Sequence, residues 1–276
     1  TQSKNSTLYL NGELPTTATG KLYFTLGMQN RDASSAAFAR GGVGSDDIPS
    51  RNSAAMYPNG FVPFINGDIS DRYAILGHRW VVGDWNTDLS QTYGSNEMRY
   101  RISNTINASQ ANKDLLGGGA GRSASLFQAG GFSFSQATTN LDFSRFFDGF
   151  LLGSNVAFGA EYRRENYQIF AGEAGSYVDA DGVGFGGNAG SQGFPGFQPA
   201  DATNRNREST ALYADVETDV TQQLKVQTAV RAERYSDFGS TTTGKLAASF
   251  KANDALLFRT SASTGFRAPS LQQVYF

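Results

Sequence analysis

Residues 210–220, with the sequence TALYADVETDV, decide the fold class because their side chains alternate in character. One set of alternate positions is apolar or small: Thr210, Leu212, Ala214, Val216, Thr218 and Val220. The other set is largely polar: Tyr213, Asp215, Glu217 and Asp219. Successive side chains of a β-strand point to opposite faces, so this period of two predicts a strand with one apolar and one charged face.

The same alternation continues toward the end of the chain. One face carries Leu224, Val226, Thr228, Val230 and Ala232, then Leu246, Ala248 and Phe250, then Leu256, Phe258, Thr260, Ala262, Thr264 and Phe266. Weaker strand patterns cover residues 6–13, 22–29, 73–77, 85–101, 134–146 and 153–169, which gives about ten strands. The clearest strands have about 11–15 residues, whereas soluble strands average five or six and tilted transmembrane strands need roughly nine to eleven.

The charged face admits two interpretations. It carries Asp215, Glu217, Arg231, Glu233 and Arg259 on neighbouring strands. In a β-sandwich this would be the solvent face, whereas in a wide barrel it would line a wet lumen while the apolar face met lipid. The sequence alone does not separate the two. The apolar face favours the barrel, because its many Thr and Ala side chains are thin for a packed core but adequate against lipid.

The connections between the predicted strands alternate in length. Short links cover residues 15–20, 83–85, 147–152, 221–223 and 252–255. Long links cover residues 33–70, 104–133 and 172–206, and a shorter one covers 236–241. Short turns at one end and long loops at the other are typical of outer-membrane barrels, whose turns are periplasmic and whose loops are extracellular.

The composition argues against catalysis, metal binding and nucleic-acid binding. The chain has no cysteine, a single histidine and a net charge of −2. His78 lies in a predicted strand with no nucleophile elbow nearby, and the glycine run 117–121 lacks the Lys-Ser/Thr of a phosphate loop. Asp179-Ala180-Asp181-Gly182 hints at a calcium loop but lacks the terminal bidentate glutamate. We therefore expect no enzyme, no cofactor, no metal site and no nucleic-acid partner.

The most specific string lies near the end of the chain. Gly265, Phe266, Arg267, Ala268, Pro269 and Ser270 spell GFRAPS, which resembles a signature of TonB-dependent outer-membrane receptors. Residues 56–61, 155–165 and 235–242 are similar to the same family, and the resemblance extends from about Tyr23 to Phe276. The alternative interpretation, which does not depend on any family, is that these residues are simply the end of a strand followed by a loop that proline terminates.

The resemblance implies a fold and a function. Such receptors are barrels of roughly 22 strands whose lumen is closed by a plug. They lie in the outer membrane of Gram-negative bacteria, in contact with its lipid, and bind scarce nutrients such as siderophores, cobalamin or oligosaccharides. Import is energised by the TonB-ExbB-ExbD complex, which acts through a plug and its TonB box.

We expect residues 1–276 to be a barrel fragment of about ten strands, because no plug, TonB box or second half of the barrel is recognisable in them. Two alternatives stay open. One is a passive porin-like channel, and the other is a surface-exposed β-domain such as an adhesin.

The candidate ligand contacts are aromatic and polar residues of the predicted long loops, together with the motif arginine. They are Tyr57, Asn59, Phe61, Phe194, Phe197 and Arg267. The alternative for the aromatic residues is packing of loop on loop, and for Arg267 it is pairing with a loop carboxylate. We expect lumenal charges such as Arg231 and Glu233 to form a cross-strand network that faces the plug rather than a substrate site.

Overall fold

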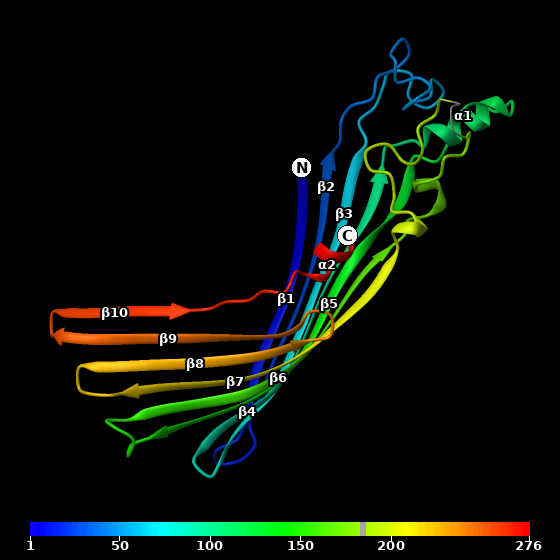
Figure 1. Cartoon of the computed structure of the whole chain (residues 1–276). Helices are drawn as coiled ribbons and strands as arrows, with labels where there is room; N and C mark the ends of the chain where they lie inside the picture. Colours follow the sequence, from blue (N-terminus) through cyan, green and yellow to red (C-terminus); the bar gives the residue numbers. More distant parts are fainter. Residues whose placement is uncertain (183–185) are drawn as a thin grey trace.

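A computed structural model describes residues 1–182 and 186–276, and ten long β-strands dominate it (Figure 1). The ten form one antiparallel sheet in which the order of the strands is the order of the chain. Their bounds are β1 (Gln2–Pro15), β2 (Lys21–Ala36), β3 (Phe64–Val82), β4 (Trp85–Ser103), β5 (Leu126–Phe147), β6 (Ser154–Phe170), β7 (Thr203–Asp219), β8 (Leu224–Tyr235), β9 (Gly239–Asn253) and β10 (Leu256–Ser263). The predicted all-β fold of about ten antiparallel strands is confirmed.

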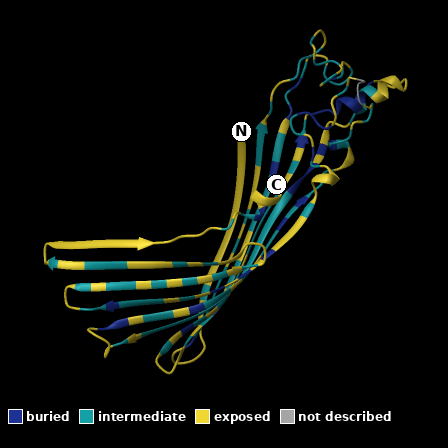
Figure 2. Ribbon diagram, viewed as in Figure 1, coloured by how far each residue is buried: buried dark blue, intermediate teal, exposed yellow. Residues whose placement is uncertain are grey.

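The sheet twists and curls into part of a barrel wall (Figure 1). Strands β1 and β10 have one strand neighbour each and form its two edges, so the barrel is not closed by these strands. Figure 2 shows both edge strands as largely exposed. The described residues form no second sheet packed on the first, so the barrel interpretation replaces the sandwich.

The two faces of the sheet differ as the alternation predicts. The outer face exposes large apolar side chains on successive strands, including Leu8, Leu26, Leu76, Leu89, Leu212, Val230, Leu246 and Phe258. The concave inner face carries ion pairs such as Arg79 with Asp88 and Arg231 with Glu161. An apolar exterior around a charged interior is the arrangement of a barrel that holds water inside and lipid outside.

Three strands begin earlier than the sequence predicts. Strands β3, β5 and β7 start at Phe64, Leu126 and Thr203, inside the segments expected to be long loops. Early in β5 the pairing with β4 is interrupted by a register shift, and Gly130 has φ of +79°. A Cβ atom there would lie 2.4 Å from the carbonyl oxygen of Phe170. Glycine at this bulge breaks the alternation by which strands are recognised in sequence.

In the described part of the chain, four short helices lie outside the sheet. They are α1 (Ala108–Leu116), η1 (Ala174–Ser176), η2 (Pro199–Asp201) and α2 (Leu271–Tyr275), none of which the sequence pattern indicated. In α1 the Asn107 side chain caps the helix by accepting a hydrogen bond from Gln110 N. Among the described residues no helix is long and apolar enough to cross a membrane.

Candidate functional site

Three long connections meet at one end of the sheet and form a single packed body, which we call the loop cap (residues 37–63, 104–125 and the described part of 171–202; Figure 1). Buried polar side chains join them. Thr105 Oγ1 donates to Gln192 O at 2.6 Å, and Asn107 Nδ2 donates to Gly175 O at 2.9 Å. Thr105 and Asn107 are fully buried, so these bonds lie within the interior of the cap rather than on its surface.

Two of the predicted ligand contacts lie in the core of the loop cap. The rings of Tyr57 and Phe61 stack with centroids 4.2 Å apart, and Phe61 is only 7% exposed. Phe61 packs with Ile106 and Ala111. The Tyr57 hydroxyl donates to Thr105 O at 3.1 Å, and burial raises the pKa of Tyr57. This geometry supports the packing interpretation for both rings.

Two asparagines of the same loop differ in their surroundings. Asn59 lies exposed at the turn between Tyr57 and Phe61. Asn52, which the sequence did not single out, is 1% exposed and donates from Nδ2 to Gly41 O at 2.8 Å and to Tyr57 O at 2.9 Å. A buried amide that bridges two stretches of one loop fixes the shape of that loop, because leaving its donors unpaired would cost free energy.

The other two predicted aromatic residues lie elsewhere, at the inner side of the loop cap. Phe194 and Phe197 join Tyr100 of β4, Phe132 of β5 and Phe276 in a set that we call the lumenal aromatic cluster. The centroid of Phe194 lies 5.0 Å from that of Tyr100 and 5.5 Å from that of Phe197. Tyr100, Phe132, Phe194 and Phe197 are half-buried, and Phe276 is 73% exposed. Aromatic rings of this kind can stack on planar rings or sugar faces.

The charged residues of the inner face form a network across three strands. Arg231 on β8 pairs with Glu233 at 2.6 Å and reaches Glu161 on β6 at 3.1 Å. Glu161 also pairs with Arg163 at 2.7 Å. The pairing register places Ala211 of β7 between Glu161 and Glu233, and this short side chain lets the long ones meet above it. The sequence predicts such a network for Arg231 and Glu233, and the structure adds Glu161 and Arg163 to it.

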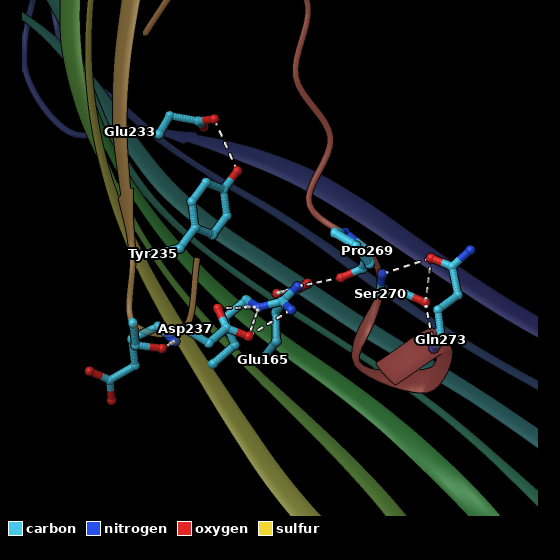
Figure 3. Close-up of polar contacts among 10 residues, drawn as sticks. Glu165, Glu233, Tyr235, Asp237, Pro269, Ser270 and Gln273 are labelled. Atoms are coloured by element: carbon cyan, nitrogen blue, oxygen red, sulfur yellow. Dashed lines mark hydrogen bonds and ion pairs between the residues drawn. The ribbon is translucent and has the colours of Figure 1, made fainter. Parts of the chain in front are cut away.

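The GFRAPS segment crosses the inner face instead of rising with the other loops (Figure 1). It lines a hollow of about 650 Å³ together with the charged network and Arg207. Arg207 is 2% exposed, and its Nη1 donates to Pro269 O at 2.8 Å. Its Nε donates to both carboxylate oxygens of Asp237, at 2.9 and 2.8 Å. Figure 3 shows Asp237, Glu165 and Pro269 gathered at this point.

Pro269, Ser270 and Leu271 attach the end of the motif to the rest of the structure. Pro269 offers its carbonyl oxygen to Arg207. Ser270 caps α2, because its Oγ accepts from Gln273 N while Gln273 Oε1 accepts from Ser270 N. Leu271 is the first helical residue and is 1% exposed, packed with Tyr167 and Ile169. The motif thus ends in a helix start that is fixed to the barrel wall.

The remaining motif residues lie along the hollow. Phe266 lies against Tyr235, with centroids 5.9 Å apart, and Arg267 is exposed. No ion pair joins Arg267 to another residue in the described part of the chain. Sequence reasoning missed Arg207, although it lies on the polar side of the β7 alternation, two residues before Ser209 and four before Ala211. Extending the alternation backwards from Thr210 would have placed it in the lumen.

The acidic residues of the third loop bind neighbouring protein groups. Asp181 Oδ2 accepts from Asn112 Nδ2 at 2.6 Å and from Gly187 N at 3.1 Å. Burial raises the pKa of Asp181, but these hydrogen bonds outweigh it and hold the pKa below its ordinary value. In residues 1–182 and 186–276 no three Asp, Glu, His or Cys side chains gather as they would around a metal ion.

Comparison with known proteins identifies the family. Residues 2–276 match the family model described as TonB dependent receptor-like, beta-barrel. The chain belongs to this family. No curated protein matches it. Among solved structures, the siderophore receptor PirA from Acinetobacter baumannii is similar over 97% of this chain and 34% of its own, with 14% identity and a TM-score of 0.59.

Two further receptors share the fold. PirA from Pseudomonas aeruginosa is similar over 98% of this chain and 40% of its own, with 11% identity and a TM-score of 0.54. The ferric-catecholate import receptor Fiu from Escherichia coli is similar over 91% of this chain and 42% of its own, with 12% identity and a TM-score of 0.52. This chain of the TonB-dependent receptor family therefore spans between a third and a half of the length of the solved receptors that it matches.

Proposed function

We propose that this chain forms part of the wall and the extracellular mouth of an outer-membrane receptor that imports a scarce nutrient. The observation that carries the proposal is that one curved sheet of this family combines an apolar outer face, a charged inner face and a packed loop cap at one end. The outer face would meet lipid, the inner face would line the lumen, and the loop cap would face the exterior of a Gram-negative cell.

The sheet edges define what else the receptor needs. In lipid every backbone N–H and C=O group must be paired, so β1 and β10 require further strands. A complete barrel of roughly 22 strands would place a plug against the charged network of the inner face. The proposed partner that energises import is the TonB-ExbB-ExbD complex, acting through that plug and its TonB box.

A siderophore is the ligand class that we favour. The solved structures of similar fold include a siderophore receptor and a ferric-catecholate import receptor, and this likeness of fold is the support for the choice. Cobalamin and oligosaccharides stay within the proposal, because the lumenal aromatic cluster could stack on planar rings or sugar faces alike. Phe194 and Phe197 are the proposed contacts from this cluster, and Arg267 and Asn59 are the proposed exposed polar contacts.

The test is uptake by the full-length protein. The receptor would be expressed in a host stripped of its own siderophore receptors, and growth on iron-siderophore complexes would be compared in strains with and without TonB. We expect membrane-bound protein and uptake that disappears when TonB, ExbB or ExbD is deleted. Uptake that persists without TonB would point to the passive porin-like channel, and recovery in the soluble fraction would point to the surface-exposed adhesin-like domain.

A further inference from the structure

Residues Gly265–Phe276 take an unexpected course through the molecule, and we call them the strap. Thr264 is still paired with β9, since its N–H donates to Gly244 O at 2.9 Å. The chain then leaves the sheet and passes along the concave side to β6 and β7, where α2 makes its contacts (Figure 1). The strap thus bridges strands that lie three and four places away from β10 in the sheet.

A buried arginine holds the middle of the strap. The Arg207 guanidinium is already neutralised by Asp237, and Glu165 adds a second carboxylate at 3.8 Å. The Nη1 atom of Arg207 donates a hydrogen bond to Pro269 O at 2.8 Å (Figure 3). Hydrogen bonds from a charged donor are stronger than neutral ones, and a buried guanidinium deprived of a partner is costly. One side chain therefore ties β7, the β8–β9 turn and the strap together.

Apolar contacts hold the far end of the strap. Leu271 and Tyr167 are each 1% exposed and pack together with Ile169. Phe276 lies edge-on to Phe132 and Phe197, with both centroid distances 6.4 Å. The strap therefore packs on the lumenal aromatic cluster through Phe276, its own member of that cluster, which stays 73% exposed.

The packing of the strap on β6 leaves one buried polar group unpaired. The Tyr167 side chain packs with Leu271 of the strap, and its buried hydroxyl has no hydrogen-bond partner among the described residues. A buried polar group without a partner destabilises the state that buries it. If the strap moved off the sheet (an open state), this hydroxyl would regain contact with water. The free-energy difference between the open and the closed state is therefore smaller than the apolar contacts alone would give.

We propose that the strap is a lid on the other four rings of the lumenal aromatic cluster and that Arg207 is its latch. The closed lid separates the cluster under the loop cap from the lumen below, and the cluster connects with that lumen when the latch releases Pro269. Its role in passing a nutrient inward rests on the proposed function, whereas the opening itself can be measured without any transport.

Single-cysteine labelling tests the lid, because the chain contains no cysteine of its own. In the full-length receptor, stripped of any other cysteine, Leu271→Cys and Gln272→Cys would be labelled with a water-soluble maleimide. Leu271 is 1% exposed and Gln272 is exposed. We expect position 271 to react at least about tenfold more slowly than position 272, since it reacts only when the lid opens.

The latch is tested by adding Arg207→Gln or Asp237→Asn to Leu271→Cys. Either change should raise the labelling rate of position 271 toward that of position 272. Arg231→Gln is the matched control, because Arg231 pairs with Glu161 and Glu233 rather than with the strap. It should leave the rate unchanged. Equal rates at 271 and 272 in the parent protein, or no change with both latch variants, would overturn the proposal.

A second measurement avoids altering Leu271. Hydrogen–deuterium exchange of the strap amides, including Val274 N–H, which donates to Ser270 O, should speed up in Asp237→Asn and stay constant in Arg231→Gln. The mobility of unheated protein on a denaturing gel reports whether each variant has folded as a barrel. If Arg207→Gln does not fold, Asp237→Asn decides the question. Failure of the lid would leave TonB-dependent uptake, and hence the proposed function, untouched.

Discussion

Val230 and Ala229 are adjacent on β8, and their side chains lie on opposite faces of the sheet. Val230 is 50% exposed on the apolar face, and Ala229 lies opposite Asp215 and Lys245 on the charged face. An arginine on the lipid face near the membrane midplane costs about 2–4 kcal/mol. We expect Val230→Arg in the full-length protein to lower the free energy of unfolding by that amount, measured by urea titration in lipid vesicles.

Ala229→Arg is the matched control for that experiment. It adds the same charge at nearly the same depth, but on the charged face, between the carboxylate of Asp215 and the ammonium of Lys245. The expected change is within about 1 kcal/mol, as for an exposed ion pair. Equal destabilisation by both substitutions would contradict the assignment of the two faces.

The sequence predicts the facing of a residue well and its partners poorly. Alternation is a local property, and it placed Val230, Arg231 and Glu233 correctly on their faces. The near-complete burial of Arg207 depends on Asp237 and Pro269, which lie 30 and 62 residues further along the chain. Such distant contacts depend on the path that the chain takes back across the sheet. The periodicity of the sequence does not predict that path.

At the scale of elements, the loop cap offers a contrast between two phenylalanines of the same loop. Phe61 is 7% exposed and stacked on Tyr57, whereas Phe38 is 87% exposed. Removing a buried phenylalanine side chain costs about 3–5 kcal/mol. We expect Phe61→Ala to open the cap locally, so that hydrogen–deuterium exchange of α1 amides becomes much faster while the strands stay protected.

Phe38→Ala should leave the same exchange rates as they are. If both substitutions acted alike, Phe61 would not belong to the core of the cap. If Phe61→Ala left α1 unchanged but weakened nutrient uptake, the ring would serve ligand binding instead of packing.

The strands were more predictable than the connections for a physical reason. A strand between lipid and water must alternate, and ten such strands were anticipated. Toward the loop cap the alternation fails: β3 begins with Asn, Gly and Asp among its first residues, β5 with the pair Gly130-Gly131, and β7 with an almost wholly polar run. The cap forms because loops far apart in sequence bury each other, as Thr105 and Gln192 do. Helix α2 has a local start signal in Ser270 and Gln273, but its position depends on the distant contacts of Leu271 with Tyr167 and Ile169.

At the scale of the whole molecule, the two free edges dominate. Strand β10 is exposed along its whole length, and β1 along nearly all of it. Two open edges in hydrocarbon leave many backbone groups unpaired. We expect residues 1–276 expressed alone to stay aggregated or proteolysed in membranes, with no change in gel mobility on heating. The full-length receptor should show that change, and the same change in residues 1–276 would mean that the edges pair with each other or with another copy.

The order of the strands also has a mechanical consequence. Each strand is hydrogen-bonded only to its neighbours along the chain, from β1 through to β10. A pulling force applied at one end would therefore peel away one hairpin at a time rather than rupture the sheet at once. The strap breaks this sequence, because Arg207 couples the far end of the chain to β7. A force applied to the C-terminal end would therefore act on β7 and β8 before β10 had separated from β9.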